Sequence, residues 1–144
     1  MLSPNPCIVY VDDNRDSLEM IELMLRMDDD SYRVSTVSTA DKALALLESQ
    51  PIDLYILDYS LPEMSGAELC RRIRQTDSRT PILFYSAMAR EIDREKAMAA
   101  GATEYLVKPN DLEKLTETVG RLLNENSFSN CKSPGSVCSY GEIQ

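Results

Sequence analysis

The chain has 144 residues, a formal net charge of −9 and 43% hydrophobic residues. This length fits one domain with its own core, and no stretch reaches the roughly 20 apolar residues that span a bilayer. The negative charge disfavours direct nucleic-acid binding, and the absence of histidine excludes histidine-based triads, histidine-ligated zinc and a phosphohistidine within the chain.

Five strand-like segments alternate with helical patterns along the first 124 residues. Segments 8–11, 54–57 and 82–85 are continuous apolar runs, which are typical of central parallel strands covered on both faces. Segment 33–37 is half polar and segment 104–107 is short, so we expect these two at the edges of the sheet.

Apolar residues recur at helical spacing between the predicted strands. The final helix has the clearest pattern, and Asn110 or Asp111 is its expected cap. Residues 91–100 are rich in alanine and weakly amphipathic, so we expect the least firmly packed helix there. The four apolar patterns are Leu18, Ile21 and Leu25; Ala40, Ala43 and Leu47; Leu69, Cys70 and Ile73; and Leu112, Leu115, Val119 and Leu122.

Strict alternation of strands and helices predicts an α/β fold with right-handed crossovers. We expect a three-layer αβα sandwich around a five-stranded parallel sheet of flavodoxin-like order 2-1-3-4-5. The folded domain is expected over 6–124, and the serine-rich segment 125–144 is expected to be a flexible tail or linker. Residues 1–6 show no signal-peptide pattern, so we expect a cytoplasmic protein.

Acidic, hydroxyl and basic side chains follow four of the predicted strands. In chain order these are Asp12, Asp13, Asp58, Ser86 and Lys108. Because the carboxyl ends of parallel strands meet at one edge, we expect these side chains to lie together. Three neighbouring carboxylates repel one another, which raises at least one pKa. An oxygen-preferring cation such as Mg²⁺ would relieve this repulsion.

Each residue alone also has an ordinary structural explanation. Asp13 or Asn14 could cap the first helix, and Asp58 could be a turn residue before Leu61 and Pro62. A single serine or lysine at a strand end usually has no special role. The order of an acid pair, an acid, a hydroxyl and a lysine at four strand ends favours one shared site.

With these residues, the chain resembles the receiver domains of response regulators in two-component signalling, and it is similar to the stand-alone chemotaxis type. The resemblance covers about residues 6–124 and is specific as a set of motifs. The motifs are VDDN at 11–14, LDYSLPEMSG at 57–66, YSA at 85–87, AGA at 100–102 and YLVKP at 105–109.

The resemblance implies a role for each residue of the predicted site. Asp58 is implied to be the nucleophile that accepts a phosphoryl group as an acyl phosphate. Asp13, Asp58 and the backbone carbonyl of Ser60 are implied Mg²⁺ ligands, with Asp12 acting largely through water. Lys108 and the metal would neutralise charge on the transferring group.

The resemblance also implies a switch formed by Ser86 and Tyr105. After phosphorylation, the Ser86 hydroxyl is expected to move toward the phosphoryl group, and Tyr105 is expected to turn into the vacated space. The expected output surface is formed by the fourth helix, the fifth strand and the fifth helix. In this family the bond between Lys108 and Pro109 is typically cis, and we predict a cis bond here.

Because the chain has no histidine, the resemblance implies an external phosphoryl donor. A sensor histidine kinase or a histidine phosphotransfer protein is the expected partner, together with an unidentified downstream protein. The output surface is also a candidate homodimer interface. We expect no direct binding of nucleic acid and no membrane association.

Two other functions remain open on the sequence alone. The first is an interaction module of the same fold that is never phosphorylated, although such modules usually lack one of the acids or the lysine. The second is a metal-dependent phosphatase with an aspartyl-phosphate intermediate. Such enzymes commonly carry a second acid two residues after the nucleophile, where this chain has Ser60. We therefore expect a signalling switch that catalyses its own phosphorylation, and not a dedicated enzyme.

Overall fold

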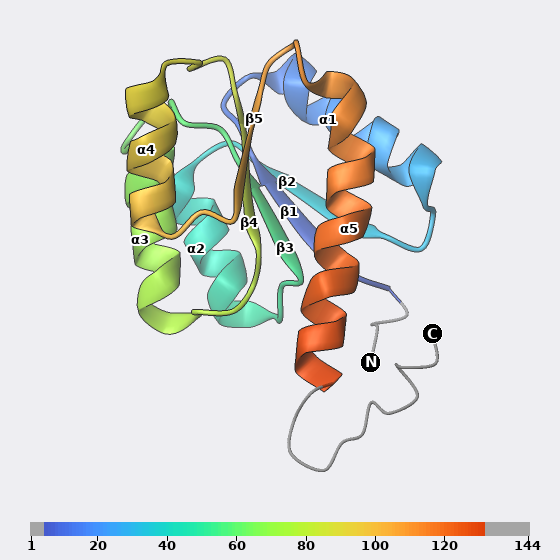
Figure 1. Cartoon of the computed structure of the whole chain (residues 1–144). Helices are drawn as coiled ribbons and strands as arrows, with labels where there is room; N and C mark the ends of the chain where they lie inside the picture. The colour runs from blue at the N-terminus through green and yellow to red at the C-terminus, as the bar shows by residue number, and fades with distance from the viewer. Residues whose placement is uncertain (1–4, 132–144) are drawn as a thin grey trace.

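The computed structural model of this chain describes residues 5–131, which form one parallel sheet with helices on both faces (Figure 1). The ten elements alternate between strand and helix. They are β1 Cys7–Val11, α1 Arg15–Asp28, β2 Arg33–Val37, α2 Ala40–Ser49, β3 Leu54–Leu57, α3 Gly66–Thr76, β4 Ile82–Ser86, α4 Glu91–Ala100, β5 Glu104–Val107 and α5 Leu112–Cys131.

The strand order is β2-β1-β3-β4-β5, and every neighbouring pair is parallel. This confirms the predicted flavodoxin-like order. It also confirms that β2 and β5 are the edge strands. Every residue of β1, β3 and β4 is buried, as the continuous apolar runs indicated, because helices cover both faces of the central strands.

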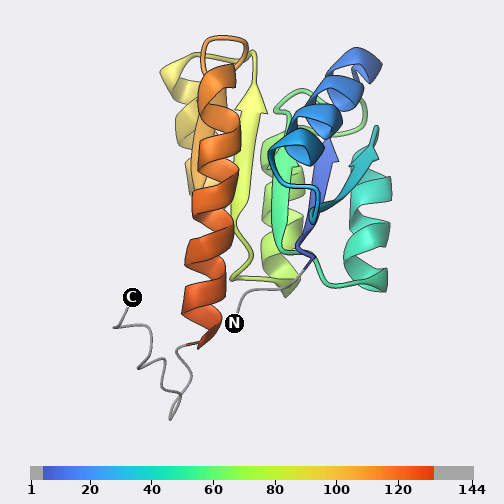
Figure 2. The ribbon, with the colours of Figure 1, turned by 90° about the vertical axis from the view of Figure 1, so that its right-hand side faces the viewer.

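Two helical layers enclose the sheet, which confirms the three-layer sandwich. Helices α2, α3 and α4 lie on one face, and α1 and α5 lie on the other (Figures 1 and 2). The core is correspondingly divided in two. One cluster includes Val9, Leu69 and Phe84, and the other includes Ile21, Ile56 and Leu115. Buried apolar surface on both faces is the main stabilising contribution to this architecture.

Local signals begin the first three helices. The side chains of Asn14, Thr39 and Ser65 accept hydrogen bonds from backbone N–H groups in the first turns of α1, α2 and α3. Asn14 is therefore the cap that the sequence offered as one alternative. Asp111 instead accepts a hydrogen bond from the Val107 N–H at 2.9 Å, which ties β5 to the start of α5.

Helix α5 extends beyond the domain boundary that the sequence predicted. The sequence predicted that the domain ends at 124, but α5 continues through residues 125–131. Neither glycine nor proline interrupts these residues, and extending an existing helix costs far less free energy than starting one. The rest of the predicted tail lies outside the described residues. Among the helices that the structure describes, none is long and apolar enough to cross a membrane.

Candidate functional site at the carboxyl edge of the sheet

Backbone hydrogen bonds place three charged residues at the same edge of the sheet. Each lies one residue beyond its strand, and its N–H donates to a neighbouring strand. The bonds join Asp12 N to the Val37 carbonyl at 3.2 Å, Asp58 N to the Val11 carbonyl at 3.0 Å and Lys108 N to the Ser86 carbonyl at 2.9 Å. The sheet therefore fixes the backbone of the site before any side chain interacts.

The side chains that the sequence predicted at this edge do converge. Carboxylate oxygens of Asp12, Asp13 and Asp58 all lie within 4.8 Å of one another. Asp12 is fully buried and Asp58 is 8% exposed, whereas Asp13 is exposed. The Lys108 ammonium lies 2.5 Å from Asp12 Oδ2 and 3.8 Å from Asp58 Oδ2. Residues almost 100 positions apart in the chain thus form one cluster.

Asp12 is held by three donors. Its Oδ2 accepts from the Tyr10 hydroxyl at 2.6 Å and from Lys108, and its Oδ1 accepts from the Asn14 N–H at 2.9 Å. These bonds offset the cost of burying its charge. Asp12 is therefore a fixed anion that orients Lys108 beside Asp58.

Asp58 is in a less favourable environment. Burial raises the pKa of Asp58 above its ordinary value, and the negative charge of Asp12 raises it further. The positive charge of Lys108 and a hydrogen bond from the Ser86 hydroxyl act in the opposite direction. This agrees with the expectation that crowding raises at least one carboxyl pKa. A cation at this edge would favour the ionised form.

Ser86 and Tyr105 also lie close to this cluster. Ser86 is fully buried, and its Oγ accepts a hydrogen bond from the Met88 N–H at 3.2 Å. Tyr105 is 3% exposed, and its hydroxyl donates to the Met88 carbonyl at 2.5 Å. Its ring is stacked on Phe84, with centroids 5.6 Å apart. Tyr105 therefore points inward, which is the orientation that the predicted switch gives to this side chain.

Three parts of the site were not predicted. Tyr10 belongs to an apolar run, so its bond to Asp12 could not be distinguished from ordinary core packing. Tyr85 faces the Lys108 ammonium, which lies 5.6 Å from its ring centroid. A Cβ at Gly66 would lie 2.2 Å from the Asp58 carbonyl oxygen, so only glycine fits there. The glycine in the 57–66 motif was the one available signal.

Two expected features of the surrounding loops can be located. The Lys108–Pro109 bond is cis, as predicted. Ser60 pairs with Ser65 in an isolated antiparallel bridge, in the loop that follows Asp58. This bridge holds the loop where it returns to the start of α3.

Comparison with known proteins identifies the family. Residues 8–120 match the response regulator receiver domain. The chain belongs to the response regulator receiver family. Its members act in phosphorylation-based two-component signalling, as switches and not as dedicated enzymes.

Relatives and solved structures agree with this assignment. The receiver domain is 37% identical to the response regulator ArlR of Staphylococcus epidermidis over 81% of this chain and 52% of ArlR. It is 32% identical to a probable transcriptional regulatory protein of Picosynechococcus over 99% of this chain and 59% of that protein. The chain thus spans between half and three fifths of the length of these relatives.

Solved structures include receiver domains with bound metal. One is the receiver domain of the sensor histidine kinase PA1611 from Pseudomonas aeruginosa, with a magnesium ion in its active-site cleft. It is 33% identical, with a TM-score of 0.75 over 83% of this chain and 98% of that one. Another is the response regulator TrrA from Thermotoga maritima in complex with Mg²⁺ and BeF. It is 29% identical, with a TM-score of 0.72 over 81% of this chain and 98% of TrrA.

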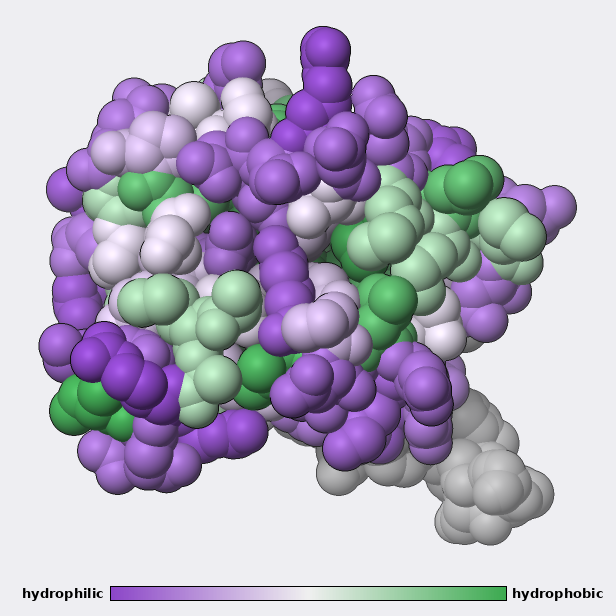
Figure 3. All heavy atoms as spheres, turned by 90° about the horizontal axis from the view of Figure 1, so that it is seen from above, coloured by the Kyte–Doolittle hydropathy of each residue, from purple (hydrophilic) through white to green (hydrophobic). Residues whose placement is uncertain are grey.

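The polarity of the receiver-domain surface varies from one side of the site to the other. Figure 3 looks down on the carboxyl edge of the sheet and shows mostly hydrophilic residues near its centre. Hydrophobic residues gather on the right of this view, on the side of α1. Met20, Leu23 and Met27 of α1 are 43%, 59% and 76% exposed. Helix α1 therefore exposes apolar side chains at the protein surface.

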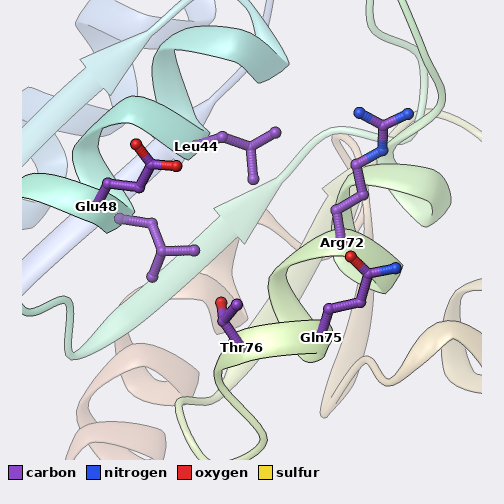
Figure 4. A pocket seen from close by; sticks show the side chains of 6 residues that line it. Leu44, Glu48, Arg72, Gln75 and Thr76 are labelled. Carbon is purple, nitrogen blue, oxygen red and sulfur yellow. The ribbon is translucent and has the colours of Figure 1, made fainter.

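A separate groove of about 450 Å³ lies between α2 and α3 (Figure 4). It is lined by Leu44, Leu47, Glu48, Arg72, Gln75 and Thr76. In Figure 4, Glu48 of α2 and Arg72 of α3 lie on opposite sides of the groove. None of the acidic cluster residues lines it, so the groove is not part of the candidate site.

Proposed function

We propose that this receiver domain is a switch in which Asp58 accepts a phosphoryl group from a phosphohistidine donor in a Mg²⁺-dependent reaction. The observation that carries the proposal is the position of Asp58. Its carboxylate lies within 4.8 Å of the fixed anion Asp12 and 3.8 Å from the Lys108 ammonium, which Asp12 shares. An interaction module would not need this arrangement of buried charges. The desolvation cost of such charges can exceed the stability gained from pairing them.

The acidic cluster fits Mg²⁺ in its chemistry. Asp13, Asp58 and the backbone carbonyl of Ser60 would hold the ion, with Asp12 acting largely through water. Carboxylate and carbonyl oxygens are the ligands that Mg²⁺ prefers, and it commonly keeps several waters. When bound, Mg²⁺ would neutralise negative charge on the carboxylates and on the incoming phosphoryl oxygens.

The chain's own residues then have defined tasks in the transfer. An Asp58 carboxylate oxygen attacks phosphorus and forms the new O–P bond, while the N–P bond to the donor histidine breaks. The electron pair of that bond stays on the imidazole nitrogen, which takes up a proton. Lys108 supplies a point charge next to the phosphoryl oxygens, and Asp12 keeps its ammonium in place.

The phosphoryl group would act on the output surface through Ser86. It adds about −1.5 to −2 charges and three acceptor oxygens. A new bond from the Ser86 hydroxyl would favour the arrangement in which Tyr105 is inward. The downstream protein and a homodimer contact through the face of α4, β5 and α5 remain predictions. The absence of DNA binding by this chain is also a prediction. A relative is named a probable transcriptional regulatory protein, so this prediction needs a direct binding measurement.

The decisive experiment is incubation with Mg²⁺ and acetyl phosphate, followed by intact-mass measurement. The wild-type chain should gain one phosphoryl group, and it should gain none when Mg²⁺ is removed by EDTA. Asp58→Asn should remain unmodified. The matched control is Asp53→Asn, because Asp53 accepts from the Cys7 N–H at the opposite edge of the sheet. Modification of Asp58→Asn at the wild-type rate would refute the assignment.

A further inference from the structure

An ion pair between an exposed arginine and a buried acid lies at the start of helix α4. Asp93 is 2% exposed, and both of its oxygens accept hydrogen bonds from Arg90, each at 3.0 Å. The Arg90 carbonyl in turn accepts from the N–H groups of Asp93 at 3.0 Å and Arg94 at 3.2 Å. A carboxylate withdrawn from water requires such a partner. Backbone and side chain of Arg90 are therefore both joined to the first turn of α4.

The segment that Arg90 ends carries Met88, which contacts both residues of the proposed switch. The Met88 carbonyl accepts from the Tyr105 hydroxyl, and the Met88 N–H donates to Ser86 Oγ. The position of Met88 thus determines whether an inward Tyr105 hydroxyl has a hydrogen-bond acceptor. Only one residue, Ala89, separates Met88 from the Arg90 of the ion pair.

Helix α4 also contacts the Tyr105 ring directly. The Arg94 guanidinium lies 5.4 Å from the ring centroid, where a cation–π attraction is favourable. Burial raises the pKa of Tyr105 to about 12, so the hydroxyl keeps the proton that it donates to Met88. The first turn of α4 therefore acts on Tyr105 through Met88 and through Arg94.

We propose that the Arg90–Asp93 ion pair is a positioning device that holds Met88 where it keeps Tyr105 inward before Asp58 is phosphorylated. This inference rests on the proposed switch role of Ser86 and Tyr105. The inward arrangement is then populated in the unphosphorylated protein, and phosphorylation adds to an existing bias. Loss of the ion pair shifts the population toward an outward Tyr105.

A purely structural role makes a different prediction. Helix α4 has no side-chain cap at its N-terminus. In a purely structural role, the ion pair would stabilise the first turn of the helix and do nothing else. In that case its removal lowers the unfolding midpoint but leaves the environment of Tyr105 unchanged. The experiment must therefore report on Tyr105 itself, in addition to stability.

The test is ¹⁹F NMR of the full chain labelled with fluorotyrosine, with the Tyr105 signal assigned by Tyr105→Phe. Asp93→Asn removes the buried charge, and Arg90→Gln removes the exposed partner should Asp93→Asn not fold. Arg90→Lys is the conservative variant. Glu91→Gln is the matched control, because Glu91 is an exposed acid in the same helical turn. All spectra are first recorded without Mg²⁺ or phosphodonor.

Wild type, Arg90→Lys and Glu91→Gln should show a buried Tyr105 signal. Asp93→Asn and Arg90→Gln should lose at least half of it to an exposed signal. Mg²⁺ with acetyl phosphate should restore the buried signal. An unchanged Tyr105 signal in both charge-removing variants overturns the proposal, and so does an exposed Tyr105 in the wild type. If Asp58 is not phosphorylated at all, only the restoration step fails, and that outcome counts against the proposed function.

Discussion

At the two edges of the sheet, the surroundings shift the pKa values of two acids in opposite directions. At the amino edge, Asp77 accepts from the Thr80 hydroxyl at 2.5 Å, the Thr80 N–H at 3.0 Å and the Arg79 N–H at 3.0 Å. Burial opposes ionisation of Asp77, but these bonds outweigh it and lower its pKa. At the carboxyl edge, burial and Asp12 raise the pKa of Asp58. An acid surrounded by donors stabilises a loop, whereas an acid next to another acid is available for chemistry.

The cations at the two edges show the same difference. Arg74 donates to the carbonyls of Gly101 at 2.9 Å, Asp77 at 3.0 Å and Thr80 at 2.8 Å. Its guanidinium is therefore occupied by fixed backbone acceptors. The Lys108 ammonium contacts two carboxylates and remains a point charge that an incoming anion can share. Structural and functional charges thus differ in what they contact and not in residue type.

Lys108→Met gives the largest expected effect. Removing the cation should slow phosphorylation of Asp58 by acetyl phosphate about 100-fold, because charge stabilisation in the transfer is lost. The measurement is the initial rate by intact mass, on protein shown to be folded by circular dichroism. Lys114→Met is the control, since Lys114 is an exposed lysine of α5 that pairs with Asp111 just before the helix. A rate within a factor of three of wild type would contradict the role of Lys108.

Gly66→Ala should act on both stability and chemistry. Its Cβ would meet the Asp58 carbonyl, so the loop from Asp58 to α3 must shift. We expect a loss of about 2 kcal/mol in the free energy of unfolding, as is typical of overpacking. Phosphorylation should also slow, because the acceptor moves. Chemical denaturation measures the first effect. Gly120→Ala is the control, because its nearest neighbour would be 4.0 Å away.

Asp77→Ala should lower stability at the amino edge without affecting phosphorylation at the carboxyl edge. It removes three hydrogen bonds at the amino edge, and we expect a loss of roughly 1.5 kcal/mol in the free energy of unfolding, after allowance for partial exposure. The phosphorylation rate of the folded variant should stay at the wild-type value. Urea denaturation and intact mass provide the two readouts. A large drop in rate without unfolding would show that the edges are coupled.

Asp58→Asn should have the smallest effect on stability, and one of opposite sign. Without divalent cations it should raise the free energy of unfolding on the order of 1 kcal/mol at pH 7, because it removes a charge whose folded-state pKa is raised. The native state holds this proton to higher pH than the unfolded state does. Protonated Asp58 therefore contributes to the wild-type free energy of unfolding at low pH, and this contribution is lost as pH rises above about 4. Denaturation of both proteins across pH 4–8 should show a widening difference. A constant or shrinking difference would mean that Asp58 is not under repulsion.

Much of the fold and the site followed from the sequence. The apolar runs at 8–11, 54–57 and 82–85 are in the predicted central strands, and the alternation of elements predicted the strand order. Because parallel strands end at one edge, residues after those strands had to meet there. Asp58 and Lys108 could thus be brought together from strand ends alone, although they are 50 positions apart in the chain.

Other features depended on the tertiary structure. The sequence could not show that Tyr10 supports Asp12, that Tyr105 points inward or that Arg90 binds a buried Asp93. Periodicity records which side chains avoid water. It does not record which polar atom finds which partner, because that choice depends on distances between residues far apart in the chain. The sequence thus determined where the strands end and which charges follow them, whereas only packing decided which of those charges are satisfied.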